Sequence, residues 1–322
     1  MALRLTYGPD NIDTLLTTTQ SVVQKMGDYL NDAIFNSIPL LNWLNSKAKV
    51  SQQGGASILI PLLYAKNTTF AAYSGLDLFD TGVQEGLTLA QAHWRNYGGT
   101  IALVGDELRQ NAGQGKIFDY VKAKTMQATM SGADALAVDL LATTQGTKKV
   151  QALPILVDTT SSVFDIARST NSWWQSQVTA SGSFAGQGLA DMRTLRDNIM
   201  IRKQAGGVTP DFGLTTATVK QLYEAALVPS IRYESRQAAD ASFESLKFSS
   251  MVVELDNNCP SGNFFMLSSK VLQFVVNSDT NWKVGKFVEP TNQDAFVAKV
   301  IWMGNLVSNN PRCLGKLTGV TA

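Results

Sequence analysis

The stretch AHWRNYGGTIALVGDEL, residues 92–108, holds the residue types in this chain that are best suited to chemistry. It contains His93, which is the only histidine, the glycine pair Gly98–Gly99, and the adjacent acids Asp106 and Glu107. A histidine near carboxylates is typical of general acid–base catalysis, and paired glycines are typical of loops that bind phosphate. Both interpretations would make this stretch a functional site.

Neither pattern is completed by the rest of the sequence. Any Ser–His or Cys–His mechanism would have to use His93, and GSFAG at residues 182–186 has the wrong order for a nucleophile elbow. In QNAGQGKI, residues 110–117, the lysine is followed by isoleucine, so the phosphate-loop spacing fails. Cys259 and Cys313 lie far apart and form no metal-binding motif. We therefore expect no catalytic residues, no cofactor and no metal site, and we do not expect an enzyme.

The same stretch reads well as a strand that leads into a helix. Alternation along a strand places His93 on one face with Arg95 and Tyr97, while Trp94 points to the other face. Asp106 and Glu107 then flank the junction between this strand and the helix that follows. On this interpretation the stretch has a structural role.

Composition describes a globular chain without a dominant charge. The chain has 322 residues, of which 44% are hydrophobic, and its 27 basic and 26 acidic residues leave a net charge of +1. A protein whose main function is to bind nucleic acid usually has an excess of basic residues, and this chain has no such excess. No apolar run approaches the ~20 residues that a membrane span needs, so we expect no membrane association.

Hydrophobic periodicity predicts an α+β chain with five segments. Residues 1–50 read as a mostly helical N-terminal arm that Pro39 interrupts, and residues 51–112 as an extended two-stranded loop. Residues 113–150 contain the longest helical pattern, which we expect to run to about residue 145. Strands and helices alternate over residues 151–278, including helices at 188–203 and 216–227, and residues 279–322 return to strand.

The middle of the extended loop is unusually apolar for a loop. Long loops inside compact domains normally have a task, and exposed apolar patches usually mark interfaces. A hairpin of two strands is also only marginally stable alone, so the loop must lie on something else. We expect an inter-subunit contact through five side chains here: Phe70, Tyr73, Leu76, Leu78 and Phe79.

The pair Trp173–Trp174 has two interpretations. Both rings fit packing in the core beneath a loop, and both also fit an anchor between subunits, where tryptophan is favoured. The residues alone leave these two alternatives open, and we include the pair among the candidate interface residues.

The order of these segments and their local amino-acid sequences resemble those of the major capsid proteins of tailed bacteriophages. This resemblance covers nearly the whole chain and depends on the order of the segments more than on any single motif. The segments that carry it are DAIFNSIPLLNWL (32–44), GGASILIPLLYAKNTTFAAYSG (54–75), AHWRNYGGTIALVGDELRQNAGQGKIFDYVKAKTMQA (92–128), FDIARSTNSWWQSQV (164–178), TPDFGLTTATVKQLYEAAL (209–227), NCPSGNFFML (258–267) and NLVSNNPRCLGKLTG (305–319).

The resemblance implies a capsid-protein fold, shared with encapsulins and the herpesvirus capsid floor. It implies a spine helix at 113–150, an axial domain at 151–278, and a peripheral domain completed by residues 279–322. Subunits would assemble as hexamers and pentamers into an icosahedral shell around double-stranded DNA, with the loop lying over a neighbour. The implied partners are further copies of the chain, a scaffolding protein and a portal, with packaged DNA contacted weakly and non-specifically. The implied location is the virion capsid, assembled in the host bacterial cytoplasm.

Three alternatives accompany this interpretation. An encapsulin-like shell would enclose enzyme cargo and not DNA. A metabolic α/β enzyme would need a convergent polar pocket, and the sequence provides none. Lys66 and Asn67, near the loop tip, fit a lysine–asparagine link between subunits, but an ordinary polar loop end is the favoured interpretation.

Overall fold

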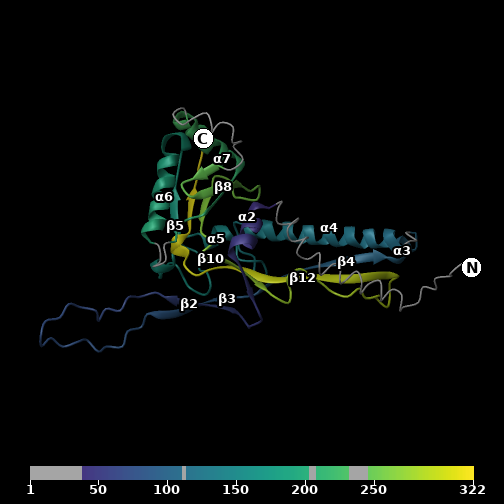
Figure 1. Ribbon diagram of the computed structural model, residues 1–322, viewed down its shortest axis with the longest axis horizontal. Helices are drawn as coiled ribbons and strands as arrows, with labels where there is room; N and C mark the ends of the chain where they lie inside the picture. The colour runs from purple at the N-terminus through teal and green to yellow at the C-terminus, as the bar shows by residue number, and fades with distance from the viewer. Residues whose placement is uncertain (1–37, 111–113, 203–207, 232–245) are drawn as a thin grey trace, which may run out of the picture.

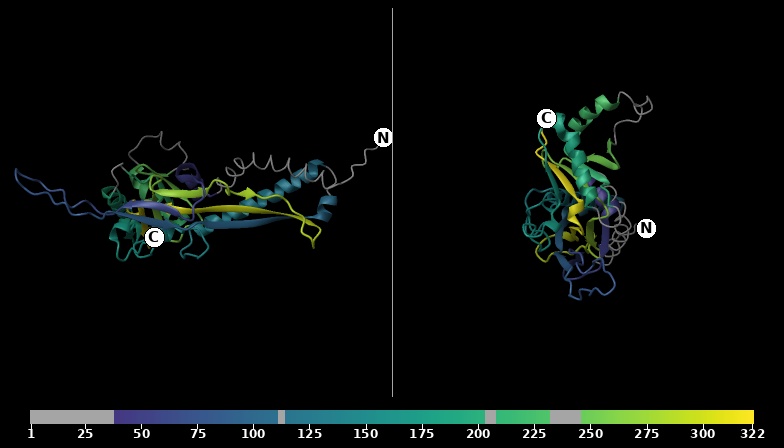
Figure 2. Two further views of the ribbon diagram at one scale, coloured as in Figure 1. Left: turned by 90° about the horizontal axis from the view of Figure 1, so that it is seen from below. Right: turned by 90° about the vertical axis from the view of Figure 1, so that its left-hand side faces the viewer.

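The computed structural model describes residues 38–110, 114–202, 208–231 and 246–322. The described strands form a five-stranded sheet, a six-stranded sheet and a separate two-stranded hairpin. Figure 1 shows these units meeting at a common centre and extending from it in different directions, and Figure 2 shows the same elongated molecule from below and end-on. Most of the predicted N-terminal arm lies outside the described residues. Its last part forms two short helical segments, α2 (Pro39–Trp43) and η1 (Leu44–Ala48).

The five-stranded sheet carries the long helix of the molecule. Helix α4 (Gln114–Leu140) packs along this sheet, and it confirms the predicted long helix, although it ends earlier than predicted. The short helix α3 (Gly105–Gln110) lies beside the N-terminal end of α4. The strand order is β1 (Lys49–Gln52), β10 (Leu272–Asn277), β12 (Ala295–Ser308) and β11 (Lys283–Val284), with β4 (Arg95–Val104) also paired to β12.

The pairing of β4 corrects one sequence prediction. The stretch 92–108 lies in the segment 51–112 that the sequence predicts as a two-stranded loop, but β4 pairs antiparallel with β12, from Arg95↔Gly304 to Val104↔Ala295. The physical reason is burial. The alternate side chains Ile101 and Leu103 pack with Val121 of α4 and Val300 of β12, a cover that a free hairpin does not provide.

Polar contacts fix β4 to the end of α4. The Tyr97 hydroxyl donates to Asp139 Oδ2 at 2.8 Å, and Lys149 Nζ donates to the other oxygen of the same carboxylate at 2.7 Å. The backbone N–H of Val150 in turn donates to the Tyr97 hydroxyl at 3.1 Å. These bonds hold the chain leaving α4 against the strand.

The six-stranded sheet gathers strands from distant parts of the chain. Helices α6 (Leu189–Ile201) and α7 (Ala217–Ile231) accompany it, and both confirm predicted helices. Three further short helical segments are α5 (Leu153–Leu156), η2 (Ser172–Trp174) and η3 (Phe184–Gly188), and η4 (Pro311–Cys313) precedes the last strand. The strand order is β5 (Gln177–Ala180), β13 (Gly315–Thr318), β9 (Phe264–Leu267), β6 (Phe212–Thr215), β8 (Met251–Leu255) and β7 (Leu246–Phe248).

Two strands join sheets other than those their position in the sequence suggested. β10 lies before residue 278 but pairs with β1 and β12 in the five-stranded sheet. β13 lies after residue 279 but pairs with β5 and β9 in the six-stranded sheet. The two sheets therefore exchange strands, and only four residues, Ser268–Val271, connect β9 to β10.

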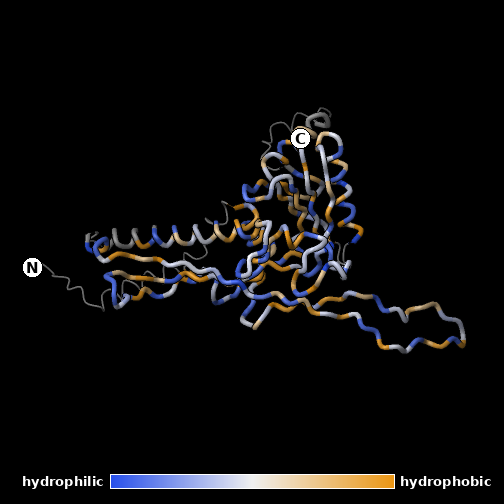
Figure 3. The backbone as a smooth tube through the Cα atoms, turned by 180° about the vertical axis from the view of Figure 1, so that it is seen from behind, coloured by the Kyte–Doolittle hydropathy of each residue, from blue (hydrophilic) through white to orange (hydrophobic). Residues whose placement is uncertain are grey.

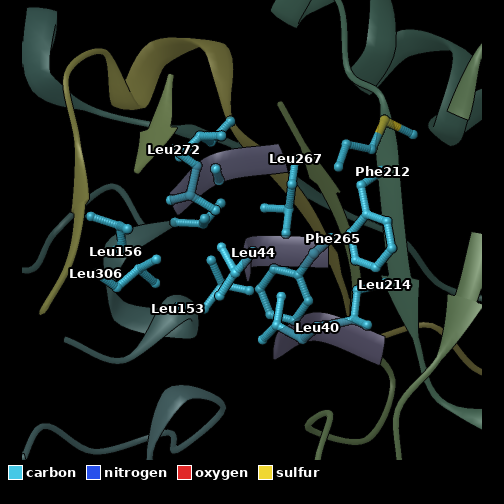
Figure 4. Close-up of a cluster of buried hydrophobic side chains, with 14 of the residues drawn as sticks. Leu40, Leu44, Leu153, Leu156, Phe212, Leu214, Phe265, Leu267, Leu272 and Leu306 are labelled. Carbon is cyan, nitrogen blue, oxygen red and sulfur yellow. The ribbon is translucent and has the colours of Figure 1, made fainter. Parts of the chain in front are cut away.

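One large hydrophobic core joins the sheets. Figure 4 shows its centre, where Leu40 and Leu44 from the first described helices lie among side chains of β6, β9 and β10. Leu136 and Leu140 from the end of α4 belong to the same cluster. Because every unit contributes to this cluster, the sheets are held in a fixed relation to each other.

Trp282 connects this core to the region beneath the spine helix. It packs against the main cluster and against both smaller clusters near α4. A Cβ added at Gly132 on α4 would lie 2.4 Å from the Trp282 ring. Gly132 therefore lets the helix approach the indole closely.

This contact predicts an unusual result for a helix substitution. Alanine at an exposed helix position normally adds up to ~1 kcal/mol relative to glycine. We expect Gly132→Ala instead to lower the unfolding free energy by about 1–3 kcal/mol, because overpacking displaces Trp282. Denaturant unfolding measures the change, with Ser131→Ala as the control next to it, which we expect to leave stability nearly unchanged. A Gly132→Ala protein as stable as the parent would contradict this packing.

Candidate inter-subunit surface on the projecting hairpin

The hairpin consists of β2 (Ile58–Leu63) and β3 (Leu87–Ala92), paired antiparallel from Ile58↔Ala92 to Leu63↔Leu87. Its inner face alternates as a half-buried strand should, and Ile58, Ile60 and Leu62 are buried in the main core. This burial fixes the base of the hairpin to the subunit, so the hairpin leaves the molecule in a defined direction (Figure 1).

Three contacts outside the core hold the same base. Trp94 Nε1 donates to the carbonyl of Gly55 at 2.9 Å, and the backbone N–H of Gln91 donates to the carbonyl of Phe164 at 3.3 Å. The ring of Tyr64, just beyond β2, stacks on Trp173 with centroids 5.3 Å apart. These contacts fix the base of the hairpin to the body of the subunit.

Between the strands, residues 64–86 form the tip, which has no ladder of its own. Local hydrogen bonds shape it: Thr68 Oγ1 donates to Gln84 Oε1 at 2.8 Å, and Ser74 N donates to Asp77 Oδ2 at 2.8 Å. Between Ser74 and Asp77, Gly75 has φ +52°, a backbone conformation that favours glycine. The tip is therefore a shaped loop with an internal turn.

The five predicted interface side chains of the tip are all exposed. Phe70 is 91% exposed, Leu76 100% and Leu78 98%, and Tyr73 and Phe79 contact each other with ring centroids 4.9 Å apart. Figure 3 shows hydrophobic stretches continuing along the hairpin to its tip. Because soluble monomers rarely expose contiguous apolar patches of this kind, the tip is the main candidate for a contact with another molecule.

The sequence prediction missed further apolar residues on the hairpin. Val83 is exposed on the tip, and four leucines are exposed on the outer face of the stem. The signal was present in ILIPLL, residues 58–63, because a half-buried strand normally alternates with polar residues and this one does not. The four leucines of this outer stem face are Leu59, Leu63, Leu87 and Leu89.

The two adjacent tryptophans, for which the sequence left two interpretations open, differ in their burial. Trp174 is only 2% exposed and its Nε1 donates to the carbonyl of Val163 at 3.2 Å, so it belongs to the subunit's own core and is removed from the interface candidates. Trp173 is half-buried and stacks on Tyr64 at the hairpin base. Its exposed part stays a candidate for an interface.

A buried arginine holds the segment that carries these tryptophans. Arg168 is fully buried and donates to the carbonyls of Ile155, Leu156 and Trp174 at 3.0, 2.6 and 3.0 Å. Burial lowers the pKa of Arg168 to about 10, against the opposing effect of Asp158, so it stays charged at neutral pH. Three carbonyl acceptors satisfy the charge that burial would otherwise penalise.

Asp158 is the acid of the same neighbourhood. Burial acts to raise its pKa, but the Lys316 ammonium at 3.3 Å and hydrogen bonds from Thr160, Thr159 and Ser161 outweigh this and hold the pKa of Asp158 well below its usual range. Lys316 lies on β13 and also donates to the carbonyl of Pro154 at 3.0 Å. The pair therefore links the segment after the spine helix to the six-stranded sheet.

The residues that suggested chemistry are not brought together. His93 lies between β3 and β4, where the strand prediction was wrong, and its Nε2 is 3.9 Å from Asp165 Oδ2 on the surface. Asp106 lies in the first turn of α3 and pairs with Arg109 at 2.8 Å, as expected for a strand–helix junction. Gly98 and Gly99 lie within β4. Within the described ranges, no group of three or more histidine, cysteine or acidic side chains is arranged to hold a metal ion.

None of the helices in the described part of the chain combines the length and the apolar character that crossing a membrane requires.

Comparison with solved structures shows the fold. A chain of the cyanophage A-1(L) capsid matches with a TM-score of 0.58 and 14% identity, covering 88% of this chain and 93% of its own. A capsid chain of the native GTA particle matches with a TM-score of 0.59 and 9% identity, covering 87% and 90%. The holo-SrpI encapsulin from Synechococcus elongatus PCC 7942 matches with a TM-score of 0.52 and 8% identity, covering 86% of each chain.

No protein-family model matches the sequence, and no curated protein matches it either. At identities of 14% and below, the structural matches show the fold alone. The fold is that of the tailed-phage major capsid proteins, which encapsulins share, and it confirms the fold that the sequence resemblance implied.

The Asp158–Lys316 pair predicts acid sensitivity. Because the folded-state pKa of Asp158 lies below the unfolded value of ~3.9, the pair stabilises the fold fully above that value and loses its contribution as the pH falls below it. We expect Asp158→Asn to lower the unfolding free energy at neutral pH by on the order of 1–3 kcal/mol, since Lys316 loses its charged partner and keeps only the carbonyl of Pro154 as an acceptor. The variant should also lose part of the pH dependence of stability in acid.

Chemical unfolding across an acid-to-neutral pH series measures both effects. Asp197→Asn is the matched control, because Asp197 pairs with Arg196 at the surface, where an ion pair contributes little. Equal stability losses for Asp158→Asn and Asp197→Asn at neutral pH would contradict the assigned role.

Proposed function

We propose that this chain is the structural subunit of an icosahedral phage capsid, which self-assembles as hexamers and pentamers around a double-stranded DNA genome. The observation that carries the proposal is the projecting hairpin tip, whose apolar side chains are exposed in a fold whose solved neighbours include capsid chains. A subunit with such a tip requires a second surface to cover it. Another copy of the same chain is the partner that a shell provides.

The energetics favour a cohesive role for the tip. Burying one leucine or phenylalanine side chain contributes about 1.5–3 kcal/mol. Phe70, Leu76 and Leu78 are almost fully exposed, so nearly all of this free energy is available to a contact between subunits. Repetition of the contact at every subunit would stabilise a closed shell.

We assign the remaining segments by the same proposal. Residues 151–278 contribute most of an axial domain that meets other copies at the capsomer centre. The spine helix with β4, β11 and β12 forms the peripheral domain, and the hairpin lies over a neighbour. Trp173 stacks on Tyr64 at the hairpin base, so any movement of the hairpin on assembly would change the contact between these two rings.

The other partners follow from the same function. A net charge of +1 suits a container that contacts packaged DNA weakly and releases it, because many phosphate contacts would oppose ejection. A scaffolding protein and a portal are the further partners, with assembly in the host bacterial cytoplasm and final location in the virion. The chain carries out no catalysis in this proposal.

Negative-stain microscopy of the purified full chain tests the proposal. We expect uniform closed particles or capsomers, and nuclease-protected DNA in particles from infected cells. Particles that enclose protein cargo and no DNA would replace the phage capsid with an encapsulin-like shell. A stable monomer at high concentration, with or without a scaffold, would contradict both.

The tip should separate assembly from folding. We expect deletion of residues 70–80 to leave a folded subunit, with unchanged circular dichroism and a cooperative melt, that forms no stable shells. The reason is that α6 and α7 pack without the tip, whereas a contact between subunits loses its apolar side chains.

Point variants make the same test without a deletion. Leu76→Asp/Leu78→Asp should abolish shells in sedimentation, whereas Leu76→Met/Leu78→Met keeps the apolar character and should assemble like the parent. Robust shells from the aspartate pair would show that the tip is not the contact. Unfolding of the deletion variant would instead place the tip in the subunit's own core.

A further inference from the structure

A groove runs along the flank of the spine helix, between α4 and β4, with a volume of about 470 Å³. On the helix it is lined by Lys124, Gln127, Ala128, Ser131, Gly132 and Ala135, and on the sheet by residues 97–102 of β4 and by Val300 of β12. Most of these side chains are small, so both walls let another backbone come close. The groove has the shape of a seat for a packed segment.

Gly99 leaves the floor of this groove open. It pairs with Val300, whose side chain is buried on the face of the sheet toward α4. A Cβ built at Gly99 would meet nothing within 4 Å. Trp282 also lines the groove, and its buried Nε1–H has no acceptor in the part of the chain that the structure describes. Both features fit a groove whose occupant lies outside that part.

The position where the described chain begins points to the occupant. Ile38 precedes α2, and the leucines of α2 and η1 share one core cluster with Leu136 and Leu140 of α4. Leu136 follows the groove residue Ala135 directly. Figure 1 shows α2 beside the inner end of α4, so the described chain begins near that end of the groove.

The sequence of residues 15–35 supplies a matching segment. Its apolar residues recur at helical spacing, and about 21 residues of helix would be roughly 30 Å long, against roughly 40 Å for α4. Phe35 lies within about 10 Å of Ile38 along the chain, so this helix would begin at the groove. The apolar stripe includes Leu15, Val22, Val23, Met26, Leu30 and Ile34.

We propose that the N-terminal segment of the same subunit, residues 15–35, docks its apolar stripe into the groove between α4 and β4. The contact would cover the exposed flank of the spine helix and complete the packing around Trp282. It concerns a single subunit and needs no shell, so it stands or fails separately from the proposed capsid function.

A thiol placed in the groove tests this docking in the full chain. Ser131→Cys reports the groove, and Met130→Cys, exposed on the other flank of α4, is the control. The natural cysteines give little background, because both are buried and burial, together with Asp256, raises the pKa of Cys259 to about 12. We expect a small maleimide to label Cys at position 131 at least about tenfold more slowly than Cys at position 130.

A second pair of variants tests the occupant. Val22→Asp/Met26→Asp places charge on the apolar stripe and should bring the two labelling rates together, whereas Ser21→Asp, on the opposite side of the predicted helix, should leave the protection intact. Protection by the subunit's own segment does not change on dilution. Protection that disappears on dilution would assign the groove to a second copy and overturn the proposal.

A groove variant covers the case in which the arm variant alters folding. Gly99→Leu places a side chain in the groove without changing the arm, and a Cβ at this position meets nothing within 4 Å. We expect trypsin to cleave the full-length Gly99→Leu chain at Lys25 faster than the parent. Equal labelling of the two thiols in the parent, or unchanged cleavage in Gly99→Leu, would overturn the proposal.

Discussion

A hairpin of two strands has only one layer, so the side chains at its tip have no second layer of their own subunit to pack against. This constraint governs the molecule. The stem of β2 and β3 is anchored because one face enters the core, but the tip projects beyond any cover. An apolar tip under this constraint makes the isolated subunit incomplete. Association with other molecules is the direct physical way to complete it.

The rest of the structure keeps the tip in place. The main core draws residues from both sheets, from the end of α4 and from the first described helices, so the units cannot pivot freely. The exchange of β10 and β13 between the sheets adds backbone connections to that core. Arg168 and the Asp158–Lys316 pair then fix the segment on which Trp173 meets the hairpin base. A rigid body that presents one exposed contact suits repeated assembly.

The sequence predicted the parts of the fold that depend on local patterns. Helices α4, α6 and α7 and the strand β2 carry their periodicity in their own residues, and the apolar tip was visible as a loop with too many aromatic and leucine residues. The resemblance to capsid proteins, which depended on the order of these segments, gave the fold that the solved structures show.

Local sequence patterns do not predict which strands pair when the strands lie far apart in the chain. The residues of strand β4 also fit a continuation of the hairpin, because no local pattern identifies β12, about two hundred positions away, as its partner. The same holds for β13, which crosses to the six-stranded sheet. Trp173 and Trp174 are adjacent and chemically identical, and only the path of the surrounding chain decides that Trp174 is buried and Trp173 is half-exposed.

The central claim is that the hairpin tip is covered by another copy of the chain. Hydroxyl-radical footprinting, which reports the solvent exposure of individual side chains, tests it on unassembled subunits and on assembled particles of the same preparation. We expect oxidation of Phe70, Leu76 and Leu78 to fall strongly on assembly, because these side chains are exposed in the single subunit. Equal oxidation of the tip in both states would contradict the account.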